Sequence, residues 1–295
     1  MGIEVIYTLD QFESEWWSGI VKRFRAKYIK TPKEYVNLFV TSGKIKKEKI
    51  KSDISKSIEK IRESIWENYL KDEVVFHKEV LTYLMNNRNV PKEILEKILE
   101  ENFNQDELID FSGGFQEKIT RLVGEYAGRI MPYIYYLSLS TTNSRRSRAG
   151  KTFEAVIEYV LDCFGYTYDN QSKLGLNFYK ENKIGKMVDC VIPNKEAYSK
   201  KRDKCIIITM KTTLRERWQE VVEELNRTNI PHIYLMTLDS ALTKNVLTNM
   251  ERQNITIVTY ESIESKFKKR NNIISFETFF NEEIPHNLKY WERQK

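Results

Sequence analysis

Two charged residues, Asp189 and Lys211, interrupt apolar segments that are typical of buried strands. Asp189 lies between the apolar Val188 and Cys190, and Lys211 follows the segment CIIITM. An ionised aspartate inside a sheet is costly without a partner, so it must face a sheet edge or a functional cleft. Carboxylates bind Mg²⁺ and a lysine can polarise an attacking water. Adjacent strands carrying this pair could therefore act on a phosphodiester.

A second metal-binding carboxylate must come from elsewhere in the chain. Many nucleases place one two residues before the lysine, but that position is Thr209 here. The following helix has an apolar stripe made of Trp218, Val221, Val222 and Leu225. At the usual turn per residue, Glu224 lies roughly 110° from the centre of this stripe, and Glu220 and Glu223 lie about 150° away. Glu224 is thus best placed to turn toward the sheet, although all three glutamates equally fit solvated positions.

The residues Arg215, Glu216 and Arg217 form a mixed-charge cluster at the start of the same helix. Arginine pairs with O6 and N7 of guanine, and glutamate accepts from N4 of cytosine. The cluster therefore suits adjacent G·C pairs in a major groove. The alternative is an ordinary run of charges at a helix start.

A second basic segment, TTNSRRSRAGKTFE, packs four cations into a few residues: Arg145, Arg146, Arg148 and Lys151. Thr142, Asn143 and Ser144 are predicted to cap a helix that begins there. Because arginines and helix N-termini both bind phosphate, the segment is interpreted as a phosphate clamp.

Glu154 lies one turn into this helix and is flanked by Phe153 and Val156. It is therefore predicted to point inward more readily than Glu158. An exposed surface glutamate is the alternative.

The elements that must position these residues change character along the chain. Asp10 to about Leu137 is almost wholly helical in pattern, with Thr31-Pro32 and Gly43 as boundaries. After a helix from Lys151 to about Cys163, five segments are predicted to be extended: LGLNFY, KMVDCVI, KCIIITM, HIYLMTL and ITIVTY. Helices follow the last three, which is typical of an α/β domain with a mixed sheet. We expect a helical N-terminal domain over residues 1–112, for dimerisation or DNA contact, and a catalytic domain over residues 113–295.

Composition limits the remaining classes of function. The net charge of +6 favours contact with a polyanion, and the lysine-rich surface of a soluble protein accounts for it equally well. Three scattered histidines cannot build a zinc site, and three cysteines without a CxxC pair fit a reducing, intracellular compartment. No signal peptide or membrane span is expected.

The segments SRAGKTFE, VD, TMKTTLRERW and EE together resemble the branch of type II restriction endonucleases that cut sites built on CC and GG. This branch includes the catalytic domain of EcoRII and relatives cutting CCGG, CCNGG or CCWGG. The resemblance covers roughly residues 140 to 230. With its helical first half, the chain is also similar to enzymes that recognise WCCGGW. The chain departs from the family motif at Val188, where a proline is expected, and little effect follows because that proline contacts no substrate.

The resemblance implies a PD-(D/E)XK core that acts as a Mg²⁺-dependent, site-specific deoxyribonuclease in the cytoplasm of a prokaryotic cell. Lys211 would be the catalytic lysine, and the metal would be bound by Asp189, Glu224, Glu154 and the backbone carbonyl of Met210. Arg215, Glu216 and Arg217 would read bases in the major groove. Asn143 would read the minor groove, although relatives tend to use glutamine there.

The implied partners are double-stranded DNA, a second copy of the chain in a homodimer or higher oligomer, and a cognate methyltransferase as a functional but not physical partner. No membrane partner is expected. Cleavage of both strands of a palindrome would leave 5′ overhangs. A structure-selective repair or recombination nuclease stays open, although it would not need the Arg-Glu-Arg cluster. A DNA-binding protein without catalysis and an interaction scaffold built on amphipathic helices stay open as well.

Overall fold

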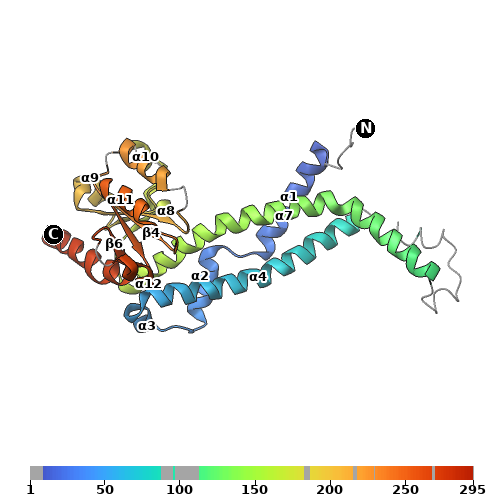
Figure 1. Cartoon of the computed structure of the whole chain (residues 1–295), viewed down its shortest axis with the longest axis horizontal. Helices are drawn as coiled ribbons and strands as arrows, with labels where there is room; N and C mark the ends of the chain where they lie inside the picture. The colour runs from blue at the N-terminus through green and yellow to red at the C-terminus, as the bar shows by residue number, and fades with distance from the viewer. Residues whose placement is uncertain are drawn as a thin grey trace. The chain divides into compact units, whose positions relative to one another are not determined.

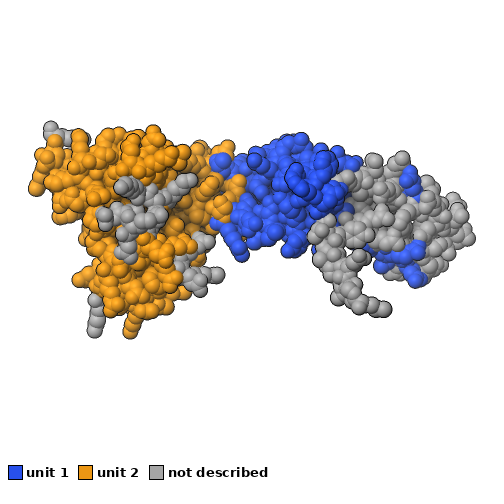
Figure 2. Space-filling view, turned by 90° about the horizontal axis from the view of Figure 1, so that it is seen from above, with its two compact units in different colours: residues 1–31, 67–146 blue, residues 32–66, 147–295 orange. Residues whose placement is uncertain are grey.

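The computed structural model describes residues 9–87, 96, 113–182, 187–214, 218–228, 230–267 and 270–294. The chain divides into two compact units, one made of Met1–Thr31 and Glu67–Arg146 and the other of Pro32–Trp66 and Ser147–Lys295 (Figure 2). Each unit thus combines segments that are far apart in sequence. The boundary expected near residue 112 lies outside the described residues, and the role expected for residues 1–112 stays a prediction.

Unit 2 contains a six-stranded sheet in the order β1-β2-β3-β4-β5-β6. The strands are β1 (Asp169–Asn170), β2 (Cys190–Ile192), β3 (Ile206–Lys211), β4 (Ile233–Thr237), β5 (Ile255–Thr259) and β6 (Ile273–Ser275). The first three strands pair antiparallel, and β3 to β6 pair parallel. The predicted α/β class with a mixed sheet is confirmed.

The helices of the described residues are numbered as in Figure 1, which labels most of them. In the order of the chain they are α1 (Gln11–Tyr28), α2 (Pro32–Thr41), α3 (Lys47–Ser52), α4 (Ile54–Asn87), α7 (Gly113–Phe164), α8 (Gln171–Glu181), α9 (Lys195–Lys201), η1 (Arg202–Lys204), α10 (Trp218–Thr228), α11 (Lys244–Arg252), α12 (Glu261–Glu264), η2 (Ser265–Phe267), α13 (Phe276–Thr278), η3 (Phe279–Glu283) and α14 (Ile284–Glu292). None of them is long and apolar enough to cross a membrane, as judged from the described residues.

Apolar burial on one face of the sheet fixes the strand register. Every second residue of a strand points to the same face, and Ile207, Leu235 and Ile257 form one core with α8, α10 and α11. A one-residue slip would move this whole set to the opposite face of the sheet and away from these three helices. Because Lys211 and Thr209 share the parity of Ile207, both lie on the α10 face of β3.

The N-terminal segment of unit 2 is tied to its C-terminal helices. Ser55, at the start of α4, donates from Oγ to Oε2 of Glu277 at 2.7 Å. Arg62 of the same helix donates to the hydroxyl of Tyr260 at 3.3 Å. Residues 32–66 therefore fold together with the sheet.

The expected strand LGLNFY is wrong, since these residues lie in α8. Leu174, Phe178 and Tyr179 are buried at helical spacing, and Asn170 caps the helix by accepting from the backbone N–H of Lys173 at 3.2 Å. The apolar content alone did not reveal this period. The other four expected strands are confirmed, and the short strands β1 and β6 were not predicted.

The predicted cap at Thr142–Ser144 is also wrong, because α7 runs without interruption through this segment. Leu137 and Thr141 are buried. The hydroxyl of Thr141 lies 3.0 Å from Nε2 of His77, and Arg145 pairs with Glu73. Since these inward polar groups have partners on α4, the helix continues where its polar composition suggested a loop.

Candidate active site

Asp189 is positioned by its hydrogen bonds to β3, in the antiparallel part of the sheet. Its backbone N–H donates to the carbonyl of Ile208 at 2.9 Å, so Asp189 is still hydrogen-bonded to β3 at the residue before β2 begins. The Asp189 side chain is 9% exposed. Its Oδ2 accepts from the backbone N–H of Met210 at 2.6 Å, and its Oδ1 accepts from Nε2 of Gln171 at 2.6 Å. The carboxylate is therefore fixed against the end of β3.

The pKa of Asp189 is raised from 3.8 to about 7, mainly by burial and in addition by the charge of Glu154. The hydrogen bond from Met210 and the charge of Lys211 oppose this rise without cancelling it. A buried acid with an acidic neighbour is typical of functional sites. Among the described residues, the positive charge near Asp189 does not offset its burial.

Glu154, on α7, is the acidic neighbour of Asp189. Burial and the charge of Glu158 raise its pKa, and the charges of Lys151 and Lys211 lower it. Asp189, Glu154 and Lys211 thus lie within electrostatic range of one another. The structure brings together these three of the predicted site residues.

Lys211 is the last residue of β3 and is partly buried. Two residues earlier, Thr209 is fully buried, and its hydroxyl has no hydrogen-bond partner. A threonine occupies the position where a second carboxylate was sought, so the acidic group on this face must come from another element. Glu154 on α7 is one such group.

The donor set fits a hard divalent cation. Asp189 and Glu154 supply carboxylate oxygens, the ligands that Mg²⁺ prefers, and a cation between them would relieve the repulsion that raises the pKa of Asp189. Glu224 belongs to α10, but its side chain lies outside the part that is described. Among the described residues, no group of three or more His, Cys, Asp or Glu side chains is placed to hold a metal.

Apart from Arg145, the predicted DNA-contact residues divide into three sets. Arg215, Glu216 and Arg217 lie outside the described residues. Asn143 and Arg146 are exposed on the part of α7 that belongs to unit 1. Arg148 and Lys151 lie on the part of α7 in unit 2. Because α7 is continuous there, no helix N-terminus assists these cations.

Arg145 is engaged within unit 1. Its Nε donates to Oε1 and Oε2 of Glu73 at 3.0 and 3.1 Å, and its Nη2 also donates to Oε2. Glu73 is 2% exposed and accepts a further hydrogen bond from the Tyr69 hydroxyl at 2.6 Å. A phosphate contact by Arg145 would compete with this ion pair.

A family model described as the C terminal of EcoRII matches residues 115–280. The chain belongs to this EcoRII C-terminal family. A type II restriction enzyme of Shigella sonnei, SsoII, is 39% identical over 169 residues, which are 55% of this chain and 55% of SsoII. The chain thus spans about half the length of this curated relative.

Solved structures of restriction endonucleases share the fold. Metal-depleted Ecl18kI in complex with uncleaved, modified DNA has a TM-score of 0.74 at 27% identity, and covers 94% of this chain and 85% of its own. The same enzyme with uncleaved DNA gives 0.70 at 28% identity, over 94% and 86%. The complex of the restriction endonuclease PspGI with substrate DNA gives 0.50 at 16%, over 93% of each chain. The predicted restriction-endonuclease-like core, preceded by a helical region, is confirmed.

Two residues in and beside this candidate site were not predicted. Gln171 binds Asp189, and Asp239, which follows β4, accepts from the backbone N–H of Leu214 at 2.8 Å. Leu214 is the residue before the Arg-Glu-Arg cluster. The sequence contains a signal for Asp239, because this residue follows an apolar strand in the same way that Lys211 ends one. The sequence contains no such signal for Gln171, because the strand next to it has only two residues.

Proposed function

We propose that this chain is a Mg²⁺-dependent type II restriction endonuclease. It hydrolyses both strands of a short palindrome with a CC…GG core and leaves 5′ overhangs. The observation that carries the proposal is the placement of Lys211 at the end of β3 within electrostatic range of two carboxyl groups, Asp189 and Glu154. Membership of the EcoRII C-terminal family and the DNA-bound structures of Ecl18kI support it.

Asp189 and Glu154 would hold the cation, with Glu224 and the backbone carbonyl of Met210 completing the set. Bound Mg²⁺ supplies Lewis-acid stabilisation of the charge that develops on the phosphoryl oxygens. Nζ of Lys211 donates to the attacking water, orients it and stabilises negative charge in a partly buried position. Met210 and Gln171 keep the Asp189 carboxylate in place for this step.

Recognition of the DNA sequence rests on two groups of residues, the Arg-Glu-Arg cluster and the segment from Asn143 to Lys151. Arg215, Glu216 and Arg217 read G·C pairs from the major groove, and Asn143 reads the minor groove. Arg146, Arg148 and Lys151 bind phosphates, and Arg145 does so where its ion pair with Glu73 allows. Flanking A·T pairs, as in WCCGGW, would extend the site.

A homodimer or higher oligomer matches the two-fold symmetry of a palindrome, so that each protomer cuts one strand. A cognate methyltransferase protects the host DNA without binding the enzyme. The protein acts in the prokaryotic cytoplasm.

Digestion of a fully sequenced plasmid or phage DNA tests this function. Wild type and Lys211→Ala are incubated with the DNA and Mg²⁺, and the fragment ends are sequenced. We expect discrete ends at one CC…GG palindrome for wild type and none for the variant. DNA that both proteins bind but neither cuts would support a DNA-binding protein without catalysis. Ends scattered over many sequences would support a structure-selective nuclease.

A further inference from the structure

Gln171 lies where the antiparallel pairing of β1 with β2 brings it opposite Asp189. In this register Asp169 pairs with Val191 and Asn170 pairs with Cys190, so Gln171 and Asp189 are the residues that follow the last pair, and Gln171 begins α8. The 2.6 Å hydrogen bond from Nε2 of Gln171 to Oδ1 occupies the carboxylate oxygen that Met210 leaves free. Each oxygen of Asp189 is thus held by one donor and keeps a second lone pair for another partner.

The turn that carries Gln171 has little support from its own helix. Gly175 adopts φ +72° and ψ +164°, which breaks α8 after its first turn. A single turn is marginal in isolation. The position of Gln171 therefore depends on what holds the start of this turn.

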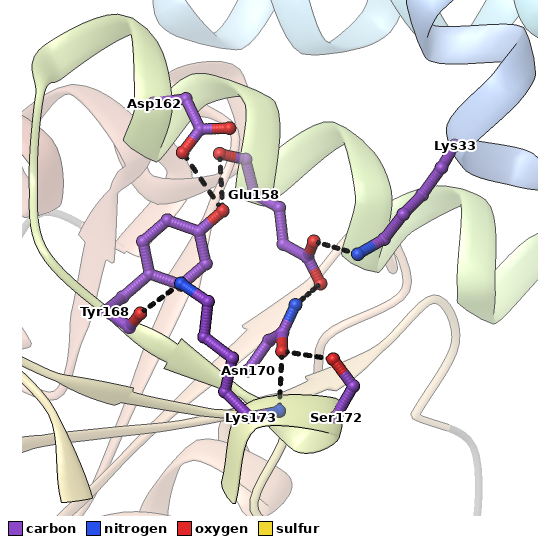
Figure 3. A network of polar contacts seen from close by, with 7 residues as sticks. All are labelled: Lys33, Glu158, Asp162, Tyr168, Asn170, Ser172 and Lys173. Atoms are coloured by element: carbon purple, nitrogen blue, oxygen red, sulfur yellow. Dashed lines mark hydrogen bonds and ion pairs between the residues drawn. The ribbon is translucent and has the colours of Figure 1, made fainter.

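A polar network holds that start (Figure 3). Oδ1 of Asn170 accepts from the backbone N–H of Lys173 at 3.2 Å and from the hydroxyl of Ser172 at 2.8 Å. Nδ2 of the same amide donates to Oε1 of Glu158, on α7, at 2.9 Å. Oε2 of Glu158 lies 2.8 Å from Nζ of Lys33, on α2. Both groups of the Asn170 amide are thus engaged, and so are both oxygens of Glu158.

We propose that Gln171 is a positioning residue that orients Asp189 for the divalent cation, and that Lys33, Glu158 and Asn170 hold Gln171 in place. The inference rests on the proposed metal-dependent function. Residues that hydrogen-bond metal ligands fix their orientation, and their loss typically weakens metal affinity or activity by about 10–100-fold. Lys33 precedes the family match, so the N-terminal segment of unit 2 contributes to the site through this network.

Mg²⁺ binding to the protein without DNA tests the proposal by a readout separate from cleavage. Isothermal titration compares wild type with Gln171→Met, which keeps the length of the side chain and removes the amide. We expect Mg²⁺ affinity to fall by about 10–100-fold. The variant should stay folded because Gln171 is exposed, with a melting temperature lowered only by the lost hydrogen bond to Asp189. In cleavage assays kcat should fall and KM for DNA should stay the same.

Asn170→Asp tests the network. The aspartate keeps an oxygen that caps α8, but it places an acceptor against Glu158 where Asn170 has a donor. We expect a smaller loss of Mg²⁺ affinity in the same direction. Lys173→Ala is the matched control, because Lys173 lies in the same turn and its Nζ donates to the carbonyl of Tyr168 at 3.2 Å, away from Asp189. Its Mg²⁺ affinity should equal that of wild type.

A folded Gln171→Met protein with the Mg²⁺ affinity of wild type would overturn the inference. So would an equal loss in Lys173→Ala, because it would indicate a general effect of the turn. If wild type binds Mg²⁺ but cuts no DNA, the proposed function fails, and the affinity difference between wild type and Gln171→Met still decides the role of Gln171.

Discussion

Each unit of this chain buries a carboxyl group, and the two groups have opposite surroundings. In unit 1, Glu73 is 2% exposed and accepts from Arg145 and Tyr69. Burial alone would raise its pKa, but these hydrogen bonds and the charge of Arg145 lower it overall. In unit 2, burial and Glu154 raise the pKa of Asp189.

The difference separates a structural carboxylate from one whose charge the described residues do not neutralise. Glu73 faces a guanidinium from the neighbouring helix, so its charge is neutralised within unit 1. Asp189 accepts hydrogen bonds from two neutral donors and has an acidic neighbour, and the charge of Lys211 only partly offsets its burial. Neutral donors do not balance a buried charge. A cation would give Asp189 what Arg145 gives Glu73.

Cleavage is the property in which the two carboxyl groups should differ most. Asp189→Asn should lower the cleavage rate by about 10³-fold or more, since the ligand charge is lost where the transition state needs it. Glu73→Gln should leave the rate per folded molecule within about threefold, because Glu73 contacts no reacting atom. Single-turnover cleavage of a plasmid, normalised to the folded fraction, measures both. A comparable loss in the two variants would contradict the distinction.

The dependence of stability on pH should differ next. Asp189 titrates at about 7 in the folded chain and near 3.8 unfolded, so the folded protein binds the proton more tightly. Stability without metal is therefore fully present below pH 4 and falls as pH rises toward 7. At about 1.4 kcal/mol per pH unit, the loss reaches roughly 4 kcal/mol. Asp189→Asn should escape this loss, because its amide oxygen can accept from Met210 and Gln171 can turn its own amide to accept.

Urea denaturation in EDTA between pH 4 and 8 measures this effect. The advantage of Asp189→Asn over wild type should be absent near pH 4 and largest at pH 8. Asp203→Asn is the control, since Asp203 is exposed on η1 and should not change the slope. Added Mg²⁺ should stabilise wild type at pH 8 and leave Asp189→Asn unchanged. If stability depended on pH in the same way in wild type and Asp189→Asn, the titration of Asp189 could not be the cause of the loss.

Removing the charge of Glu73, the carboxylate that is paired with Arg145, should lower the stability of the folded protein. Glu73→Gln should cost about 3 kcal/mol, the lower end for a broken buried ion pair, because the Arg145 side chain is 45% exposed and can be hydrated. The midpoint of urea denaturation at pH 7 measures this cost. Glu67→Gln, an exposed glutamate on the same helix, should change stability by less than about 0.5 kcal/mol. A neutral Glu73→Gln would mean that the ion pair contributes nothing.

The sequence predicted the parts of this fold that depend on local pattern. Apolar runs located β2 to β5, and charged residues at strand positions located Asp189 and Lys211. Apolar neighbours favoured Glu154 over Glu158 as the inward residue, and in the structure both are partly buried: the charge of Glu154 acts on Asp189, and Glu158 binds Lys33 and Asn170. Gly43, expected to end a helix, adopts φ +64° after α2.

The parts that escaped prediction depend on partners distant in sequence. Arg145 was interpreted from the sequence as a phosphate ligand, and in the structure it binds Glu73, which lies 72 residues earlier in the chain. The continuity of α7 depends on the same pairing. Gln171 acquires its partner through the register of a two-residue strand, and no periodicity reports a strand of that length. Local composition cannot reveal such contacts because each is made only when the chain folds.

Two glycines, one in each unit, extend the comparison to the backbone. Gly175 has φ +72° and ψ +164°, a conformation that essentially only glycine adopts, and a Cβ there would meet no atom within 4 Å. Gly175→Ala should therefore cost about 1–2 kcal/mol from backbone strain alone, and should also displace the turn that carries Gln171. Gly19, inside α1, also has open space, so Gly19→Ala should stabilise by about 0.5–1 kcal/mol. Relative to wild type, we expect the denaturation midpoint to fall in Gly175→Ala and to rise in Gly19→Ala. Mg²⁺ binding should weaken only in Gly175→Ala. If Gly175→Ala kept both its stability and its Mg²⁺ affinity, the broken first turn of α8 could not be what positions Gln171.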